Sequence, residues 1–309
     1  MRITNSMLAG NFLANLNRSL TRMSGYQDQL SSKRRIVRLS DDPIGTINTL
    51  AIRKKIDRLD QYQKNVSDAS SWLTQSETAL MDVNEVLKSA YEQALEASSD
   101  TVGKVDRDAI ASYMEELRDH LFQTGNSTYG DKYIFGGYNT TTPPFTQSGT
   151  DVLYNGIDLT TAPAADIDAQ NAQKIEFEIG TGKRVKVAMT GAEVMGTGND
   201  NLIKIFDDLI AGLKAGDQDA IAASTSRISE RQDHVLSLVA DIGGQSNRLE
   251  FVSNRYELDR INYLTVQSDI EDIDTAEVIM QYKAAESVYT AALSAGSKII
   301  QPSLIDFLN

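Results

Sequence analysis

Residues 40–97 read SDDPIGTINTLAIRKKIDRLDQYQKNVSDASSWLTQSETALMDVNEVLKSAYEQALEA, and this stretch decides the fold. Asp42 precedes Pro43, an order that predicts a helix start, because Asp accepts hydrogen bonds from first-turn amides and proline suits the first helical position. Apolar and small side chains then recur at alternating spacings of three and four. This seam consists of Leu59, Tyr62, Val66, Ala69, Leu73, Ser76, Leu80, Val83, Leu87, Ala90, Ala94 and Ala97. An unbroken helix from 43 to 98 would be on the order of 80 Å long and would need partners along its whole seam.

Two other segments provide helical partners for this seam. Ile110, Met114, Leu117 and Leu121 predict a shorter returning helix. The segment from Asn201 to about Ile242 predicts another, and Gly243-Gly244 would mark a bend before the last long helix.

Both chain ends show heptad spacing, which is typical of coiled coils. The first end has Leu13, Leu16, Leu20, Met23, Gln27 and Leu30, and the second has Leu249, Val252, Tyr256, Asp259, Tyr263, Val266, Ile270 and Ile273. After a phase shift the spacing resumes at Ala285, Val288, Ala292, Ala295 and Ile299.

The middle of the chain changes period and holds most of the turn-forming residues. Residues 125–216 contain 13 of the 20 glycines. Residues 174–179 and 184–189 alternate strictly around Gly180-Thr181-Gly182-Lys183, which predicts a β-hairpin with one buried face. Asn155-Gly156 predicts a second tight turn. We therefore expect a small β unit inserted between long helices.

The predicted fold class is mainly α, a long antiparallel helical rod or coiled coil built from the N- and C-terminal segments, with a small inserted β domain. We expect three domains. Residues 1–42 with 275–309 would form a terminal helical coiled-coil domain, residues 43–135 with 199–274 a helical rod domain, and residues 136–198 an outer β domain.

Composition disfavours several classes of function. The 30 basic and 43 acidic side chains give a net charge of −13, which argues against nucleic-acid binding. The chain has no cysteine and two histidines, so thiol chemistry is excluded and no catalytic or multi-histidine metal site is expected. We expect neither an enzyme nor a cofactor. We also expect no membrane insertion and no cleaved signal peptide, which makes the protein cytoplasmic unless a dedicated machine exports it.

Two motif fragments have simpler interpretations than ligand sites. Gly180-Thr181-Gly182-Lys183 resembles part of a phosphate-binding loop, but Phe177 and Arg184 break the pattern, and a hairpin turn is favoured. Asp269, Glu271, Asp272 and Asp274 lack the glycine of a calcium loop and predict an acidic helix face or a helix junction.

Charge is segregated along the chain. Residues 1–55 carry ten basic and three acidic side chains, and residues 249–309 carry four basic and ten acidic ones. Opposite charges at the two ends favour pairing, within one chain or between neighbouring chains. The alternative is two solvated faces whose charges are unrelated.

Apolar residues cluster at the extreme ends, where most domains are polar. We expect these side chains to be buried against other subunits, although packing on the protein's own core is an alternative. Together with the terminal heptads they form the predicted assembly interface: Ile3, Met7, Phe12, Leu13, Leu16, Leu20, Met23, Leu30, Val288, Ala292, Ala295, Ile299, Leu304, Phe307 and Leu308.

Several motifs resemble a known family. Residues 29–36 (QLSSKRRI) with 40–45 (SDDPIG), and residues 247–250 (NRLE) with 268–277 (SDIEDIDTAE), resemble the N- and C-terminal signatures of the bacterial flagellin superfamily. Residues 132–137 (KYIFGG), 142–145 (TPPF) and 302–308 (PSLIDFL) look more like the hook–filament junction branch, the hook-associated proteins of type 3, than like flagellin itself.

The resemblance implies a structural protein of the bacterial flagellum, forming a ring that joins the hook to the filament. It implies four partners: other copies of the chain, hook-associated protein type 1, flagellin and a flagellar export chaperone. It also implies an extracellular location reached by type III export.

Three rival functions remain at the level of sequence. The closest is a short flagellin that forms the filament itself, and a second is a cytoplasmic coiled-coil scaffold. An enzyme is the third, disfavoured because no nucleophile–base pair or metal cluster stands out.

Overall fold

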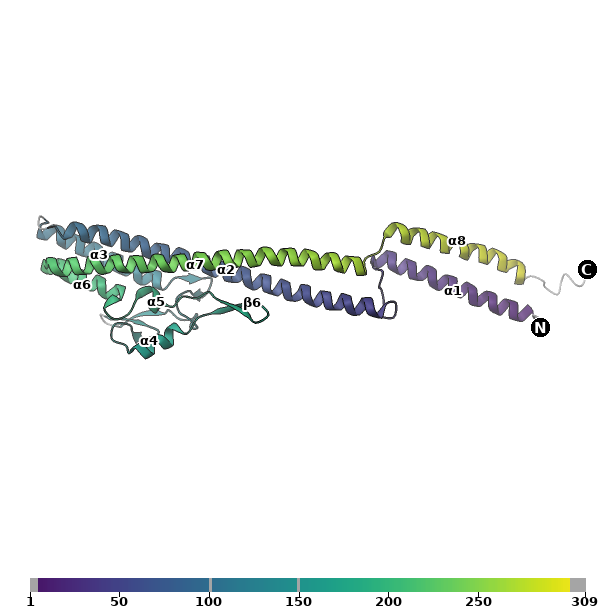
Figure 1. The fold of residues 1–309 in the computed structure, drawn as a ribbon, viewed down its shortest axis with the longest axis horizontal. Helices are drawn as coiled ribbons and strands as arrows, with labels where there is room; N and C mark the ends of the chain where they lie inside the picture. Colours follow the sequence, from purple (N-terminus) through teal and green to yellow (C-terminus); the bar gives the residue numbers. More distant parts are fainter. Residues whose placement is uncertain (1–4, 100–101, 149–150, 301–309) are drawn as a thin grey trace, which may run out of the picture. The chain divides into compact units, whose positions relative to one another are not determined.

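The computed structural model describes residues 5–99, 102–148 and 151–300, and it is mainly helical with a few short antiparallel strands (Figure 1). The predicted fold class, long helices with a small β region, is confirmed. The chain divides into two compact units: residues 1–59 with 258–309 (unit 1), and residues 60–257 (unit 2). The predicted three-domain division stays a prediction.

The longest helix begins and ends where the sequence predicts. Helix α2 spans Pro43–Ala97, and the Asp42 Oδ1 atom accepts a hydrogen bond from the Gly45 amide at 2.8 Å. Eleven of the twelve seam residues between Leu59 and Ala97 are buried, and Tyr62 is half-buried. The apolar seam of α2 therefore lies in the core of unit 2.

Three other long helices belong mainly to unit 2. Their bounds are α3 Lys104–Gly125, α6 Leu202–Ala215 and α7 Gln218–Glu271, whose last residues belong to unit 1. Residues Leu202, Ile205, Phe206 and Leu209 of α6 are fully buried. The core of unit 2 thus draws on segments more than 100 residues apart in the sequence.

One boundary differs from the prediction. We expected a single helix from Asn201 to about Ile242 and a bend at Gly243-Gly244, but the break falls at Gly216 and α7 continues through both glycines. Gly216 adopts a left-handed conformation with φ of 74°, which ends α6, whereas Gly243 and Gly244 stand in open space on an ordinary helix.

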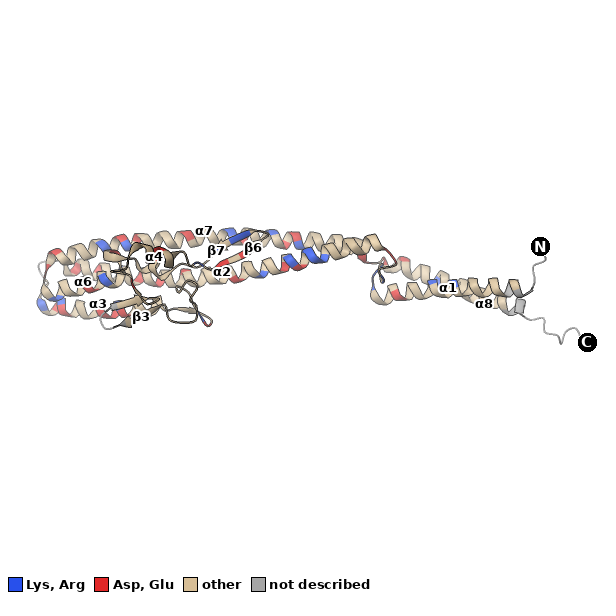
Figure 2. Ribbon diagram, turned by 90° about the horizontal axis from the view of Figure 1, so that it is seen from below, with Lys and Arg blue, Asp and Glu red and all other residues tan. Residues whose placement is uncertain are grey.

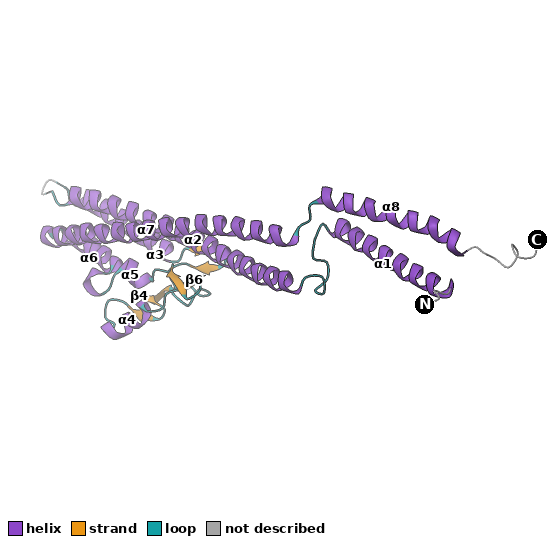
Figure 3. Cartoon of the chain, turned by 45° about the vertical axis from the view of Figure 1, so that its right-hand side comes forward, coloured by secondary structure: helices purple, strands orange, loops and turns teal. Residues whose placement is uncertain are grey.

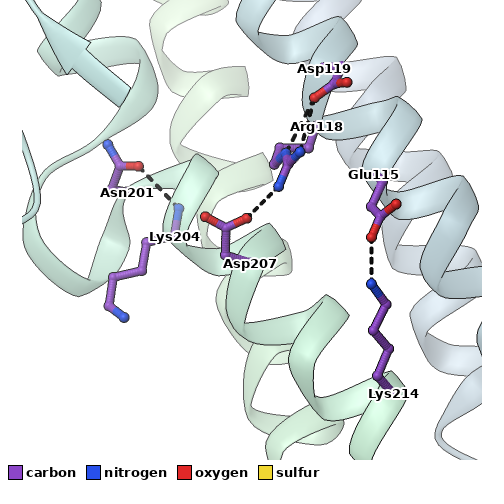
Figure 4. A network of polar contacts seen from close by, with 7 residues as sticks. All are labelled: Glu115, Arg118, Asp119, Asn201, Lys204, Asp207 and Lys214. Atoms are coloured by element: carbon purple, nitrogen blue, oxygen red, sulfur yellow. Dashed lines mark hydrogen bonds and ion pairs between the residues drawn. The ribbon is translucent and has the colours of Figure 1, made fainter. Parts of the chain in front are cut away.

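Polar contacts join α3 to α6 (Figure 4). Arg118 donates to Asp207 at 2.8 Å, and Lys214 donates to Glu115 at 2.6 Å. Asn201 caps α6 by accepting a hydrogen bond from the Lys204 amide at 3.2 Å. These partly exposed pairs align two helices whose main attraction is apolar.

The inserted region holds three small antiparallel sheets (Figure 3). The strands are β1 Thr128–Tyr129, β2 Lys132–Tyr133, β3 Phe145–Ser148, β4 Asp151–Tyr154, β5 Ile157–Asp158, β6 Glu176–Gly180 and β7 Lys183–Lys186. The short helices are α4 Ala164–Asn171 and α5 Gly191–Met195, followed by a 3-10 turn at Gly198–Asp200. Both predicted hairpins are confirmed, β4–β5 around Asn155-Gly156 and β6–β7 around 181–182.

Tyr154 organises the core of this inserted region. Its hydroxyl donates to the Phe135 carbonyl at 2.9 Å and accepts from the Gly191 amide at 3.2 Å. A Cβ atom at Gly191 would lie 2.5 Å from the Tyr154 ring, so only glycine permits this close approach. Arg231 of α7 donates to the Val194 carbonyl at 2.8 Å, which fixes α5 against the long helix.

We expect the substitution Tyr154→Phe to lower the free energy of unfolding by about 1 kcal/mol, because one buried hydroxyl with two hydrogen bonds is lost while the Gly191 amide keeps its bond to the Phe135 carbonyl. Urea unfolding followed by circular dichroism measures the change. Tyr138→Phe is the control, since Tyr138 is 65% exposed. Equal stability of the two variants would contradict the assignment.

The difference in stability between wild type and Tyr154→Phe should also depend on pH. Burial raises the pKa of Tyr154 to about 12, whereas the unfolded chain ionises near 10. The protonated Tyr154 hydroxyl stabilises the fold fully below pH 10, the pKa of tyrosine in the unfolded chain. This stabilisation is lost as the pH rises through about 12, the pKa of Tyr154 in the folded protein. The stability difference between wild type and Tyr154→Phe should therefore shrink above pH 10.

Candidate assembly surface

Unit 1 contains an antiparallel pair of helices from the two ends of the chain. Helix α1 spans Asn5–Ser32 and helix α8 spans Thr275–Ile300, and they lie side by side (Figures 1 and 3). Gly296 packs so closely on Phe12 that a Cβ atom there would overlap the ring. Few positions on this pair are charged (Figure 2).

The residues predicted for the interface divide into three groups. Met7, Leu13, Leu20, Val288 and Ala295 are exposed, and Phe12, Leu16, Met23, Leu30 and Ala292 are half-buried in the α1–α8 contact. Ile3, Leu304, Phe307 and Leu308, and the side chain of Ile299, lie outside the part that the structure describes. The described members share one helix pair, and their role in assembly stays a prediction.

Unit 1 has almost no core of its own. Among its described residues, the buried hydrophobic side chains are Ile56, Leu59 and Val278. By contrast, 16 of the 24 large exposed apolar side chains in the described chain belong to this unit. A unit with so little buried apolar area gains little stability by itself, and contiguous exposed apolar residues mark an interaction surface.

Sequence reasoning missed most of a second part of this surface, which lies around the start of α2 and the end of α7. Its exposed side chains are Leu39, which precedes α2, and Ile44, Ile47, Leu50, Leu258, Ile261, Leu264 and Val266. Of these, Val266 alone belongs to the predicted heptad series. Ile44, Ile47 and Leu50 recur every third residue, as do Leu258, Ile261 and Leu264. These are second apolar stripes beside the seam, a signal that the single-seam interpretation overlooked.

A buried carboxylate at the end of α7 contacts both the segment between α1 and α2 and helix α2 itself; we call this cluster the joint of unit 1. Glu271 ends α7, its side chain is only 6% exposed, and it forms ion pairs with Arg34, at 3.1 Å, and with Arg53 of α2. Gln267 donates to its second oxygen at 3.0 Å. The expectation of opposite charges pairing between the chain ends is met here within one chain.

Backbone contacts reinforce this joint. The Arg35 amide donates to the Glu271 carbonyl at 2.7 Å, and the Arg35 guanidinium donates to the Ile270 carbonyl at 3.0 Å. Asp274 then caps α8 by accepting from the Ala276 amide at 2.9 Å. The acidic run 269–274 is therefore a helix junction, as predicted from its lack of a calcium-loop glycine.

Two kinds of functional feature can be tested directly in the described residues. Within residues 5–99, 102–148 and 151–300, no three Asp, Glu or His side chains are grouped so that they could hold a metal ion. None of the described helices has both the length and the apolarity to cross a membrane.

Comparison with known proteins shows which class of protein the chain resembles. Residues 3–140 match the model of the bacterial flagellin N-terminal helical region. The resemblance predicted from the motifs around residues 29–45 is confirmed.

Similarity over nearly the whole chain extends to flagellar hook-associated protein 3. The protein of that name from Escherichia coli K12 is 26% identical over 310 residues, which cover 94% of this chain and 96% of the relative. A flagellin from Bacillus subtilis strain 168 is 25% identical over 288 residues, covering 91% and 90%. A putative flagellar hook-associated protein from Vibrio parahaemolyticus has the same fold, with a TM-score of 0.66 and 24% identity over 75% of this chain and all of the other.

We expect Glu271→Ala to loosen the joint of unit 1, because Arg34 and Arg53 lose their shared acceptor. The Arg35 amide should exchange with solvent roughly fivefold faster, a change of about 1 kcal/mol, since both arginines are partly exposed. Hydrogen exchange measured by mass spectrometry tests this.

Asp269→Ala is the matched control, since Asp269 is an exposed carboxylate two residues earlier on the same helix. Exchange in residues 110–121 of unit 2 should not change in either variant. Identical rates at Arg35 in the two variants would show that the carboxylate of Glu271 does not hold the joint.

Proposed function

We propose that this protein is a structural subunit of the bacterial flagellum that joins the hook to the flagellin filament. The observation that carries the proposal is the apolar surface of unit 1, which lacks a core of its own in the described residues. The superfamily match says what kind of assembly would cover that surface. The proposed role is structural and not enzymatic.

The partners follow from the same proposal. Copies of the chain associate side by side in a ring, with hook-associated protein type 1 on the hook side and flagellin on the filament side. A flagellar export chaperone covers the C-terminal helix before export, and the protein reaches the cell exterior through the type III apparatus. Helical flagellar arrays are built from contacts that are not self-complementary, which suits two different apolar stripes on one unit.

A short flagellin is the second candidate function. The identity to the Bacillus subtilis flagellin is close to that of the hook-associated relative, but the latter alignment covers more of both chains. The motifs at 132–145 also favour the junction protein. A cytoplasmic scaffold is the third candidate. It would not explain why residues 3–140 match the flagellin N-terminal helical region.

Immunogold electron microscopy distinguishes the first two candidates. We expect label at the base of the filament, next to the hook, and a deletion strain that makes hooks, lacks filaments and sheds flagellin into the medium. Label along the filament would establish the flagellin alternative. Normal motility of the deletion strain would establish the scaffold.

A point substitution tests the surface itself. Ile47→Glu places a charge on the exposed stripe of α2, where Ile47 is 66% exposed, so the monomer should fold normally. A deletion strain carrying this variant should export the protein and remain non-motile, because a charge cannot be buried in an apolar contact without a partner. Val105→Glu, at an 80% exposed position of unit 2, should restore motility. Restored motility with Ile47→Glu would exclude this stripe from assembly.

A further inference from the structure

Unit 2 contains a cleft lined by four aromatic side chains, which we call the aromatic cleft. It encloses about 470 Å³ between α2, the β1–β2 hairpin and β6. Trp72 lies on its floor. Phe177 of β6 and Ile175, which precedes that strand, are half-buried in its wall. Clefts with apolar walls and a few polar groups are where proteins bind ligands.

The floor of the cleft is rigid but has one open hydrogen-bond donor. Trp72 is only 4% exposed and packs edge-on against Tyr129, with ring centroids 6.1 Å apart and an interplanar angle of 78°. Its Nε1–H group is buried and has no hydrogen-bond partner in the described part of the chain. Such orphaned donors are rare in folded proteins.

The rim offers aromatic faces and negative charge. Tyr138 is 65% exposed and Tyr129 is 41% exposed, and both side chains line the cleft. Asp68 stands one helical turn before Trp72, and Asp131 lies in the β1–β2 turn. Neither carboxylate forms an ion pair with a described residue, and Lys132 is the single cation among the lining residues.

We propose that this cleft docks an arginine side chain presented by an extended segment of a partner protein. A guanidinium group stacks on tyrosine rings and at the same time forms forked hydrogen bonds to carboxylates. It has no acceptor, so the partner of the Trp72 Nε1–H donor would be a backbone carbonyl of the same segment. Lysine fits less well, because its compact ammonium group cannot do both. The unpaired Asp68 and Asp131 provide the complementary charge.

A neighbouring hollow accommodates the backbone of such a segment. It encloses about 550 Å³ between α2 and α7 and shares Tyr129 with the aromatic cleft. Its α2 wall carries four hydroxyl side chains: Ser67, Ser70, Ser71 and Thr74. Ser71 and Thr74 donate to carbonyls of their own helix, but all four hydroxyl oxygens can accept from peptide N–H groups, so the two hollows together suit a peptide better than a free cation. This docking site lies entirely in unit 2 and does not rest on the flagellar assignment.

The chain reports on this cleft directly, because Trp72 is its single tryptophan. The probe is the blocked peptide acetyl-Gly-Arg-Gly-amide, titrated into the full-length protein while indole fluorescence is recorded. We expect a saturable change with half-saturation on the order of 1 mM, since only a few groups are engaged. The same peptide with citrulline, which is planar but neutral, should bind at least about fivefold more weakly.

Surface variants test the charge logic without disturbing the fold. Tyr138→Ala, Asp68→Asn and Asp131→Asn should each weaken binding about two- to fivefold, and Lys132→Gln should strengthen it about twofold. Tyr113→Ala and Asp108→Asn, on α3 away from the cleft, are matched controls and should leave binding unchanged.

Three results would overturn the proposal. They are the absence of a saturable response, equal affinity for the citrulline peptide, and tighter binding after removal of either carboxylate. A fluorescence change with maltotriose but not with the arginine peptide would assign the cleft to a saccharide instead. Circular dichroism of each variant confirms that a loss of binding is not a loss of folding.

Discussion

The burial of the α2 seam is the constraint on which the rest of unit 2 depends. A 55-residue helix is far longer than a helix can be on backbone propensity alone, and apolar contacts support it over the buried seam from Leu59 to Ala97. Helices α3, α6 and α7 share this core, and the inserted region is held to α7 where Arg231 donates to the Val194 carbonyl of α5. The inserted region therefore adds strands and short helices to the surface of unit 2 without interrupting its long helices.

Unit 1 obeys the opposite rule. Its helices expose apolar stripes, and its described residues bury three hydrophobic side chains, so what holds it together is largely polar. Glu271 is central, because one carboxylate accepts from arginines of two different segments while almost excluded from water. A buried charge of this kind favours one arrangement over others more than it adds stability. Unit 1 is thus positioned by polar contacts and left open to apolar ones.

Much of the fold could be predicted because its signals are local. The α2 seam, the Asp42 cap and the two hairpins each depend on the spacing of neighbouring residues. The break at Gly216 was misplaced to Gly243-Gly244 because two adjacent glycines look like a stronger breaker than one. What decides is whether the chain must turn there to bury α6, and that depends on tertiary packing.

The candidate surface was only partly predictable for a related reason. The heptads of α1 and α8 led to their pairing, but the stripes around Ile47 and Ile261 were hidden beside a stronger seam. The aromatic cleft could not be foreseen at all, because Trp72, Tyr138 and Phe177 come from three distant segments. Spacing identifies faces of helices, whereas the meeting of faces requires the fold.

Arg35 joins two distant parts of the chain. Its amide bonds to the Glu271 carbonyl, and its guanidinium bonds to the carbonyl of Ile270, 235 positions away. Forming these bonds closes a very long loop, which costs conformational entropy. The joint of unit 1 cannot form until the C-terminal part of the chain is present, whichever end arrives first. A chain that ends before Ile270 lacks the acceptors of both Arg35 bonds, so it cannot close this joint.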